Sequence, residues 1–153
     1  MITMKITRRQ LRRLIRESMD AASPVARMFL QELSATFYSE YDARTGDFIF
    51  YDKFQDGCIV KFVIFIPGEN NIMYISDIET RGKGCQRKGY GRKVMKTLIA
   101  KSDMFDITLE LDVAPYSESI SLDDLYSFYI SLGFKPAAID DHPYRMRRLP
   151  NGR

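Results

Sequence analysis

The sequence predicts a mixed α+β (α/β) fold, in which helices flank a mostly antiparallel central sheet. Strand-like runs follow one another in the first half of the chain, separated by short turns. A strand–loop–helix–strand unit occupies the second half, and amphipathic helical runs lie before the strands and after that unit. With 153 residues, we expect a single domain, 1–153, that is long enough to bury a sizeable core.

Residues 1–35 are expected to form an N-terminal helical segment after a short strand at residues 2–6. Thr7 and Gln10 have the spacing of a capping box, which predicts an amphipathic helix over about residues 8–19. Its basic residues are Arg8, Arg9, Arg12, Arg13 and Arg16. Two interpretations stay open. The arginines could simply be solvated, or the helix could dock a nucleic acid, a membrane surface or a protein partner.

A second helix is predicted to begin at Ser23 and Pro24, which suit the N-cap and the first helical position. Its expected buried face consists of Val25, Met28, Phe29 and Leu33. Residues 36–80 then predict an antiparallel meander. Its strands are expected at 36–41, 48–54, 58–67 and 72–80. The third strand is apolar on both faces, which predicts that it is central and buried on both sides.

The most informative stretch is Gln86–Gly91, which opens the second half of the chain, residues 81–150. It lies between a strand-like run and a helix-like run that starts at Arg92. A glycine turn at a helix N-terminus directs backbone N–H groups at one point, where the helix dipole favours an anion. We therefore name Gln86–Gly91 the phosphate loop. Beyond it, we expect a strand at 107–113, a helix at 122–132 and final strands at 134–139 and 144–149.

The composition and the polar residues exclude several classes of site. Cys58 and Cys85 are isolated, so we expect neither a disulfide framework nor a zinc site, and the default environment is reducing and cytoplasmic. His142 is the only histidine, which argues against histidine-rich metal sites, and we predict no metal. No apolar run is long enough to span a membrane. Acidic residues that could attract a cationic amine are Asp112, Glu118 and Asp124.

A second motif, F-Y-x-x-x-G-F at Phe128–Phe134, gives the phosphate loop a context. The chain contains, in order, a meander, a strand, the Q-x-x-G-x-G loop, a helix, a strand and this motif. This order resembles that of the GNAT superfamily of acyl-CoA-dependent N-acyltransferases. The resemblance covers about residues 47–150. It implies acetyl-CoA as the acyl donor and direct attack by a primary amine through a tetrahedral intermediate. The amine could belong to a small molecule or a protein.

The resemblance also implies roles for individual residues. The phosphate loop would bind the pyrophosphate of CoA, and the preceding strand would bind the pantetheine arm and polarise the acyl carbonyl. The implied CoA-binding residues are Ile78, Thr80, Gln86, Arg87, Lys88, Gly89, Tyr90, Gly91 and Arg92. Tyr129 would protonate the departing thiolate, or else be an aromatic residue that packs against the CoA arm. Glu79 would be the general base, with Asp77 or water as alternatives.

The chain departs from the family pattern at three places. Leu122–Asp124 occupies the region where many members carry an asparagine, and Leu125 replaces a small residue one turn before Tyr129. Gly82 and Gly84 lengthen the junction before the phosphate loop. The predicted function is an N-acetyltransferase, acting as a monomer or homodimer. The alternative is a non-catalytic module of this fold that docks nucleic acid or protein through its basic N-terminal helix.

Overall fold

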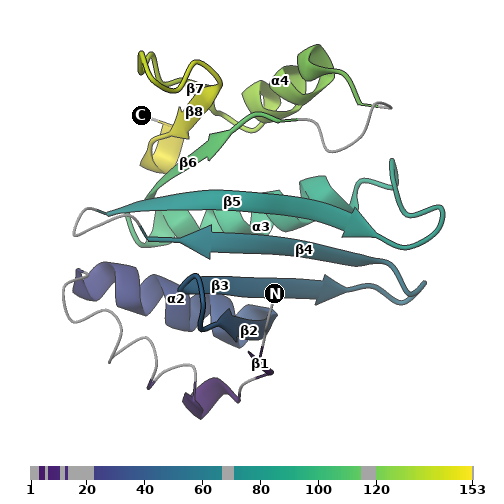
Figure 1. Ribbon diagram of the computed structural model, residues 1–153, viewed down its shortest axis with the longest axis vertical. Coiled ribbons are helices and arrows are strands. Elements are labelled where there is room, and N and C mark those ends of the chain that lie inside the picture. The colour runs from purple at the N-terminus through teal and green to yellow at the C-terminus, as the bar shows by residue number, and fades with distance from the viewer. Residues whose placement is uncertain are drawn as a thin grey trace.

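The computed structural model describes residues 4–5, 7–10, 13, 23–66, 71–114 and 120–152 (Figure 1). The described elements are β1 (Met4–Lys5), α2 (Pro24–Thr36), β2 (Tyr38–Asp42), β3 (Asp47–Lys53), β4 (Ile59–Phe65), β5 (Ile72–Arg81), α3 (Tyr90–Met104), β6 (Thr108–Asp112), α4 (Leu122–Ser131), β7 (Lys135–Pro136), β8 (Arg145–Arg148) and the 3₁₀ helix η1 (Pro150–Gly152).

Within these residues, the strands form one sheet in the order β1-β2-β3-β4-β5-β6-β8-β7. Each neighbouring pair is antiparallel except β5 and β6, which are parallel. A parallel pair needs a crossover connection, and α3 provides it. The predicted mixed, mostly antiparallel sheet flanked by helices is therefore confirmed.

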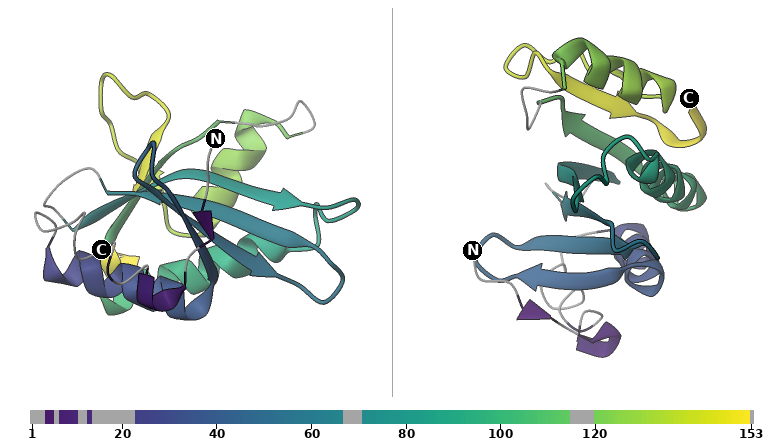
Figure 2. Two further views of the ribbon diagram at one scale, coloured as in Figure 1. Left: turned by 60° about the horizontal axis from the view of Figure 1, so that its bottom comes forward. Right: turned by 90° about the vertical axis from the view of Figure 1, so that its right-hand side faces the viewer.

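The two faces of the sheet are covered differently. Figure 2 (left) shows α2 and α3 below the sheet and α4 above it. The core lies mainly under the sheet, where α2 and α3 meet the inward side chains of the central strands. Phe62 stacks on Phe50 with a centroid distance of 5.2 Å and meets Phe37 edge to face at 5.0 Å. Such pairs add to the stability that burial of apolar area gives.

Helix α2 begins as the sequence predicts. The Ser23 hydroxyl accepts a hydrogen bond from the Ala26 amide at 3.1 Å, and Pro24 occupies the first turn. The buried stripe consists of Ala26, Phe29, Leu30, Leu33 and Ser34. Met28 was expected on this stripe and is 54% exposed, which is a correction. With about 100° between successive residues, Met28 falls to one side of the face that Phe29 and Leu33 define.

Strand β4 is central, as expected, between β3 and β5. On the helix-covered face, Val60, Phe62 and Ile64 are fully buried. The expectation of burial on both faces holds at Val63 but is wrong at Phe65, which is 40% exposed. Phe65 is the last residue of the strand, so fewer neighbouring elements can cover it.

The cysteines correct another expectation, because Cys58 and Cys85 form a disulfide across 27 residues of sequence. Antiparallel pairing explains it: Ile59 lies opposite Arg81, so residue 58 and the loop after residue 81 meet at the same end of the sheet. Sequence spacing alone does not reveal such a pair. Because the two cysteines are paired, they no longer support the expectation of a reducing environment. The cytoplasmic location stays a prediction.

Much of the predicted N-terminal helix, residues 8–19, lies outside the described residues. Arg8–Gln10 and Arg13 are described and are helical. The predicted capping box is present: Thr7 and Gln10 exchange hydrogen bonds between backbone N–H and side-chain oxygen at 2.8 and 3.1 Å. Among the helices in the described ranges, none has the length and apolar character needed to cross a membrane.

Candidate functional site

The candidate site begins where two parallel strands separate. β5 and β6 pair only from Ile72 to Ile75, opposite Thr108 to Leu111, and then diverge toward the right of Figure 1. Beyond this point, among the described strands, β5 continues to Arg81 beside β4 alone. The second half of β5 thus presents a backbone edge that can pair with an extended ligand.

A β-bulge marks the same point. The register between β4 and β5 shifts so that Val63 pairs with Asp77 and Ile64 with Ile75, which leaves Ser76 as the extra residue. Because successive side chains alternate between faces, the bulge reverses the alternation that follows. Asp77 therefore lies on the face opposite Ile75, and Ile78 returns to the face of the main core.

The phosphate loop enters α3 through a left-handed residue. Gly89 is the N-cap, with φ 80°, and within the described part of the chain no side chain caps the helix start. The first turn contains no acidic residue. Backbone N–H groups of a first turn have no partner within the helix. An uncapped, carboxylate-free helix start beside basic side chains suits a phosphate anion.

The loop is also joined to the free half of β5. The Gln86 side-chain amide donates to the Thr80 carbonyl at 3.1 Å. A Cβ atom on Gly91 would lie 3.7 Å from the Thr80 hydroxyl oxygen, an ordinary contact distance. The structure therefore brings Thr80, Gln86 and Gly91 together. Ile78 lies two residues earlier on the same strand and packs against the core.

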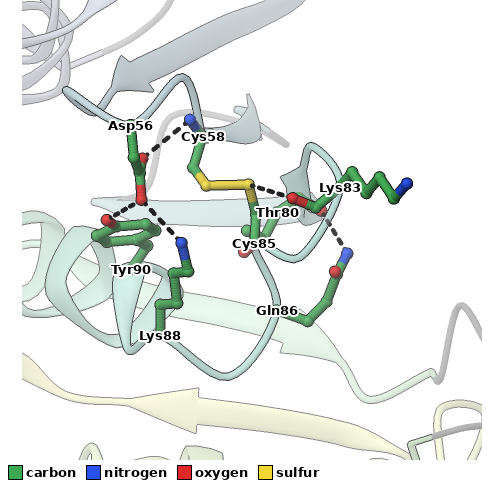
Figure 3. Close-up of a disulfide and its surroundings, with 8 residues drawn as sticks. All are labelled: Asp56, Cys58, Thr80, Lys83, Cys85, Gln86, Lys88 and Tyr90. Carbon is green, nitrogen blue, oxygen red and sulfur yellow. Dashed lines mark hydrogen bonds and ion pairs between the residues drawn. A yellow bond between two sulfur atoms is a disulfide. The ribbon is translucent and has the colours of Figure 1, made fainter.

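Two other residues of the loop turn toward the β3–β4 connection (Figure 3). Asp56 accepts hydrogen bonds from the Lys88 ammonium at 3.1 Å and from the Tyr90 hydroxyl. These bonds and that from the Cys58 amide lower the pKa of Asp56 to about 2. The Tyr90 ring stacks on Phe54 with a centroid distance of 4.0 Å. No sequence pattern singles out Asp56, which the sequence predicts only to lie within a turn.

Arg87 and Arg92 have different surroundings. Arg87 is exposed and has a positive φ of 65°. The Arg92 guanidinium donates to the Ser131 hydroxyl at 3.0 Å and lies 5.0 Å from the centre of the Phe128 ring. Arg92 thus joins the start of α3 to the end of α4 and brings the predicted aromatic motif to the phosphate loop.

Tyr129 is the buried residue of α4, with 7% of its surface exposed. Its ring meets Phe134 edge to face at 5.7 Å. Burial, and then the negative charge of Asp77, raise the pKa of Tyr129 to about 12. The phenol is therefore neutral at physiological pH, and Asp77 is close enough for its charge to act on it.

The two candidate carboxylates have different partners. Glu79 is bound by Arg81 at 2.6 Å, and its side chain is 37% exposed. Asp77 pairs with Lys61 at 3.2 Å through one oxygen, and its side chain is 19% exposed. The other oxygen of Asp77 is buried and has no hydrogen-bond partner among the described residues. A buried unpaired carboxylate oxygen is costly, so it is a natural place for a ligand N–H group to bind.

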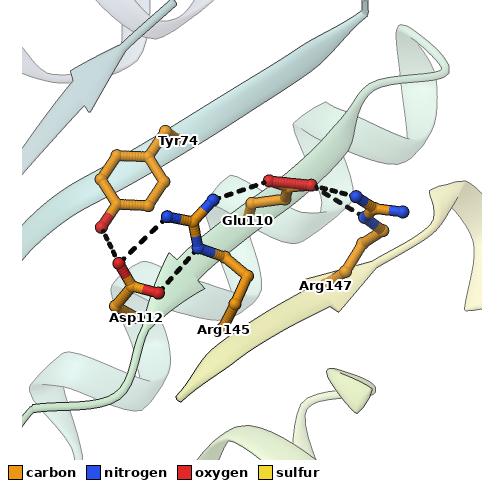
Figure 4. Close-up of polar contacts among 5 residues, drawn as sticks. All are labelled: Tyr74, Glu110, Asp112, Arg145 and Arg147. Carbon is orange, nitrogen blue, oxygen red and sulfur yellow. Dashed lines mark hydrogen bonds and ion pairs between the residues drawn. The ribbon is translucent and has the colours of Figure 1, made fainter. Parts of the chain in front are cut away.

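Two of the three acidic residues expected to attract an amine, Asp112 and Asp124, lie in the described part of the chain. Asp112 accepts hydrogen bonds from the Arg145 guanidinium at 2.7 and 3.1 Å and from the Tyr74 hydroxyl at 2.7 Å (Figure 4). Glu110 lies between Arg145 and Arg147. Burial and Asp112 raise the pKa of Tyr74 to about 12. Asp124 is exposed, and Glu118 lies outside the described residues.

The described residues contain no group of three or more His, Cys, Asp or Glu side chains that could hold a metal ion. His142 is exposed and donates its backbone N–H to the carbonyl of Ile139.

Of three comparisons with known proteins, only the search of solved structures found similar chains. Neither a scan of protein-family models nor a search of curated proteins found a match. Among solved structures, the anti-CRISPR protein AcrVA5 is similar over 65% of this chain and 96% of its own, with 22% identity and a TM-score of 0.50. A protein from Desulfovibrio desulfuricans assigned to the GNAT family of acetyltransferases is similar over 95% of this chain and 92% of its own, with 15% identity and a TM-score of 0.49. At these identities the comparisons concern the fold alone. The chain shares the overall fold of AcrVA5, and the GNAT-type fold that the resemblance implies is confirmed at the level of the fold.

Proposed function

We propose that this protein is an N-acetyltransferase that uses acetyl-CoA. The observation that carries the proposal is the helix start at Gly89, which lacks a side-chain cap and an acidic first turn. It adjoins the half of β5 that no strand covers on one side among the described residues. A pyrophosphate fits the first feature and an extended amide chain fits the second, and CoA contains both groups.

The residues of the loop would divide the binding between them. The N–H groups at the start of α3 would bind the pyrophosphate oxygens, and Arg87 is exposed nearby. Gln86 would hold the loop against β5 through Thr80. Backbone groups of Ile78 and Thr80 would pair with the pantetheine arm. Lys88, Tyr90 and Arg92 would act indirectly, because their side chains contact Asp56 or α4.

Acetyl-CoA supplies an acyl group activated as a thioester, which an amine can attack directly. The neutral phenol of Tyr129 would give its proton to the sulfur as the C–S bond breaks. A hydroxyl with a raised pKa is still a source of protons for a localised thiolate charge in a water-poor site. A backbone N–H of β5 near the bulge would donate a hydrogen bond to the carbonyl oxygen.

Removal of the amine proton requires a base, and the geometry favours Asp77 over Glu79. Asp77 has a buried oxygen without a partner and acts electrostatically on Tyr129. Glu79 is more exposed and is bound by Arg81. We therefore propose that Asp77 takes the proton, directly or through water, and keep Glu79 as the competing assignment.

A direct assay tests the proposed function. The protein is mixed with acetyl-CoA and a panel of primary amines, comprising small molecules and lysine peptides, and the released thiol is measured. We expect thiol release that depends on an amine. Calorimetric titration with acetyl-CoA in an amine-free buffer tests the donor separately. Absence of acetyl-CoA binding would reject the proposal, whereas binding without turnover would favour the non-catalytic alternative.

A further inference from the structure

The residue that immediately precedes the phosphate loop is attached covalently to a second part of the molecule. The disulfide joins Cys58, at the end of the β3–β4 turn, to Cys85, which immediately precedes Gln86 (Figure 3). The Cβ of a residue larger than glycine at position 82 would lie 2.5 Å from the Cys85 sulfur. The extra glycine at this position, a departure from the family pattern, therefore makes room for the disulfide.

The non-covalent contacts between the same two segments are weaker. The Lys88–Asp56 ion pair has side chains that are 47% and 33% exposed, and exposed pairs contribute little stability. The Phe54–Tyr90 stack adds a modest further contribution. The Tyr90–Asp56 and Gln86–Thr80 hydrogen bonds also hold the segment before α3, and the disulfide adds a covalent restraint to these contacts.

The segment from Gly82 to Gly89, which leads into α3, has a backbone conformation that an unrestrained chain would often leave. Gly82, Gly84 and Gly89 all have positive φ, and so does Arg87. Glycine has more conformational entropy to lose than any other residue, and a ligand that must order such a loop binds more weakly. A covalent restraint removes part of that cost before the ligand arrives.

We infer that the Cys58–Cys85 disulfide is a redox switch for donor binding: the oxidised protein binds acetyl-CoA, and reduction weakens that binding. This inference rests on the proposed function. A dithiol reductant supplies two electrons and two protons, becomes a disulfide itself, and leaves Cys58 and Cys85 as thiols. Because the two cysteines are 1% and 4% exposed, thiolate attack requires the loop to open first.

Thermodynamic reciprocity makes the switch testable from both sides. If the oxidised form binds acetyl-CoA more tightly by a given factor, saturating acetyl-CoA must make the disulfide harder to reduce by the same factor. A loop that is merely adjacent to the disulfide, without coupling, would show neither effect.

The first experiment compares acetyl-CoA affinity in the two redox states. Thiol titration after denaturation establishes which state is present, and calorimetry in an amine-free buffer gives Kd. Acetyl-CoA is the probe because its sulfur is blocked and cannot exchange with the disulfide. We expect a Kd about tenfold higher for the reduced protein, within the usual range of coupling between sites. The control variant Cys58→Ser/Cys85→Ser should bind like the reduced protein in both conditions.

The second experiment titrates the disulfide with mixtures of reduced and oxidised dithiothreitol. Saturating acetyl-CoA should raise the ratio needed for half-reduction about tenfold. This titration uses the unaltered protein, so it tests the coupling even if the double variant fails to fold. Equal affinity in both states, or an unchanged midpoint, would overturn the redox switch and leave the proposed function intact. If Cys58 and Cys85 are still free thiols after oxidation, the redox switch is likewise overturned and the proposed function is unaffected. Absence of binding in either state would reject the proposed function as well.

Discussion

At the scale of single residues, Tyr129 has the properties of a proton donor that is protected from solvent. Its pKa of about 12 means that it stays protonated across the physiological range. We expect Tyr129→Phe to lower turnover by about 10²–10⁴-fold, the usual contribution of a general acid. The affinity for acetyl-CoA should change little, because the ring and its contact with Phe134 remain. Thiol release and calorimetry measure the two effects.

Tyr126 provides the matched control, because it lies one turn earlier on α4 and is half-buried. Tyr126→Phe should retain turnover close to that of the unaltered protein. Loss of donor binding in Tyr129→Phe, or unchanged turnover, would assign Tyr129 to packing against the CoA arm.

Asp77 and Glu79 make competing predictions that one pair of variants separates. If Asp77 is the base, Asp77→Asn should lower kcat/KM at neutral pH by about 10²-fold or more, and Glu79→Gln should have a much smaller effect. The deficit of Asp77→Asn should shrink as pH rises, because the amine then loses its proton to solvent. Profiles of kcat/KM against pH provide the measurement.

Asp77→Asn also leaves Lys61 without its partner, so thermal unfolding must accompany the kinetics. Lys61→Met is the second control, because it breaks the same pair and keeps the carboxylate. A larger kinetic loss in Glu79→Gln than in Asp77→Asn would restore Glu79 as the base.

The sequence indicated some of these residues better than others. Local rules predicted the glycine turn and helix start at Gln86 and Gly89, and the family resemblance implied Tyr129; the roles of all three stay predictions. The sequence could not decide between Asp77 and Glu79, because both follow the β-bulge on the same face of β5 and only the folded structure shows their different burial and partners. The Cys58–Cys85 disulfide depends on the register of two strands and has no local signature.

At the scale of elements, the start of α3 depends on two glycines for different reasons. Gly89 has φ 80° with open space around a would-be Cβ, whereas Gly91 has an ordinary 3.7 Å contact there. Gly89→Ala should therefore strain the loop by about 1–2 kcal/mol and weaken acetyl-CoA binding roughly 5- to 30-fold. Gly91→Ala should be tolerated. Calorimetry on both variants tests this, and equal effects would contradict the helix-start model of the site.

The C-terminal strands show where periodicity fails to predict an element. A strand was expected over 134–139, but β7 covers only Lys135–Pro136. Pro136 has no N–H to donate, and Ala138 has φ 55°, which is outside the extended region. The helices and β3–β5 were predicted better, because their apolar patterns extend over more residues and are reinforced by clear caps and turns.

At the scale of the whole molecule, the predicted fold is confirmed, and the candidate site is a product of its topology. The diverging pair β5–β6, the start of α3 and the end of α4 come from separate parts of the chain. Only the folded sheet brings them together. The amine acceptor, the docking role of the basic N-terminal helix and the oligomeric state, monomer or homodimer, remain predictions.

The polar network on β6 and β8 predicts how the stability of the whole molecule responds to acid. The Arg145 guanidinium, followed by the Tyr74 hydroxyl, holds the pKa of Asp112 below its ordinary value. A carboxylate with a lowered folded-state pKa contributes stability above its unfolded pKa of about 3.9 and loses that stability as pH falls through the folded-state pKa.

We expect Asp112→Asn to be less stable than the unaltered protein at pH 7, and this difference in stability to shrink at pH 3. Urea unfolding at both pH values measures it. Asp140→Asn, at an exposed turn position, is the control and should cost little at either pH. A difference for Asp112→Asn that stays constant between pH 7 and pH 3 would mean that the network stabilises the sheet by packing, independently of the charge on Asp112.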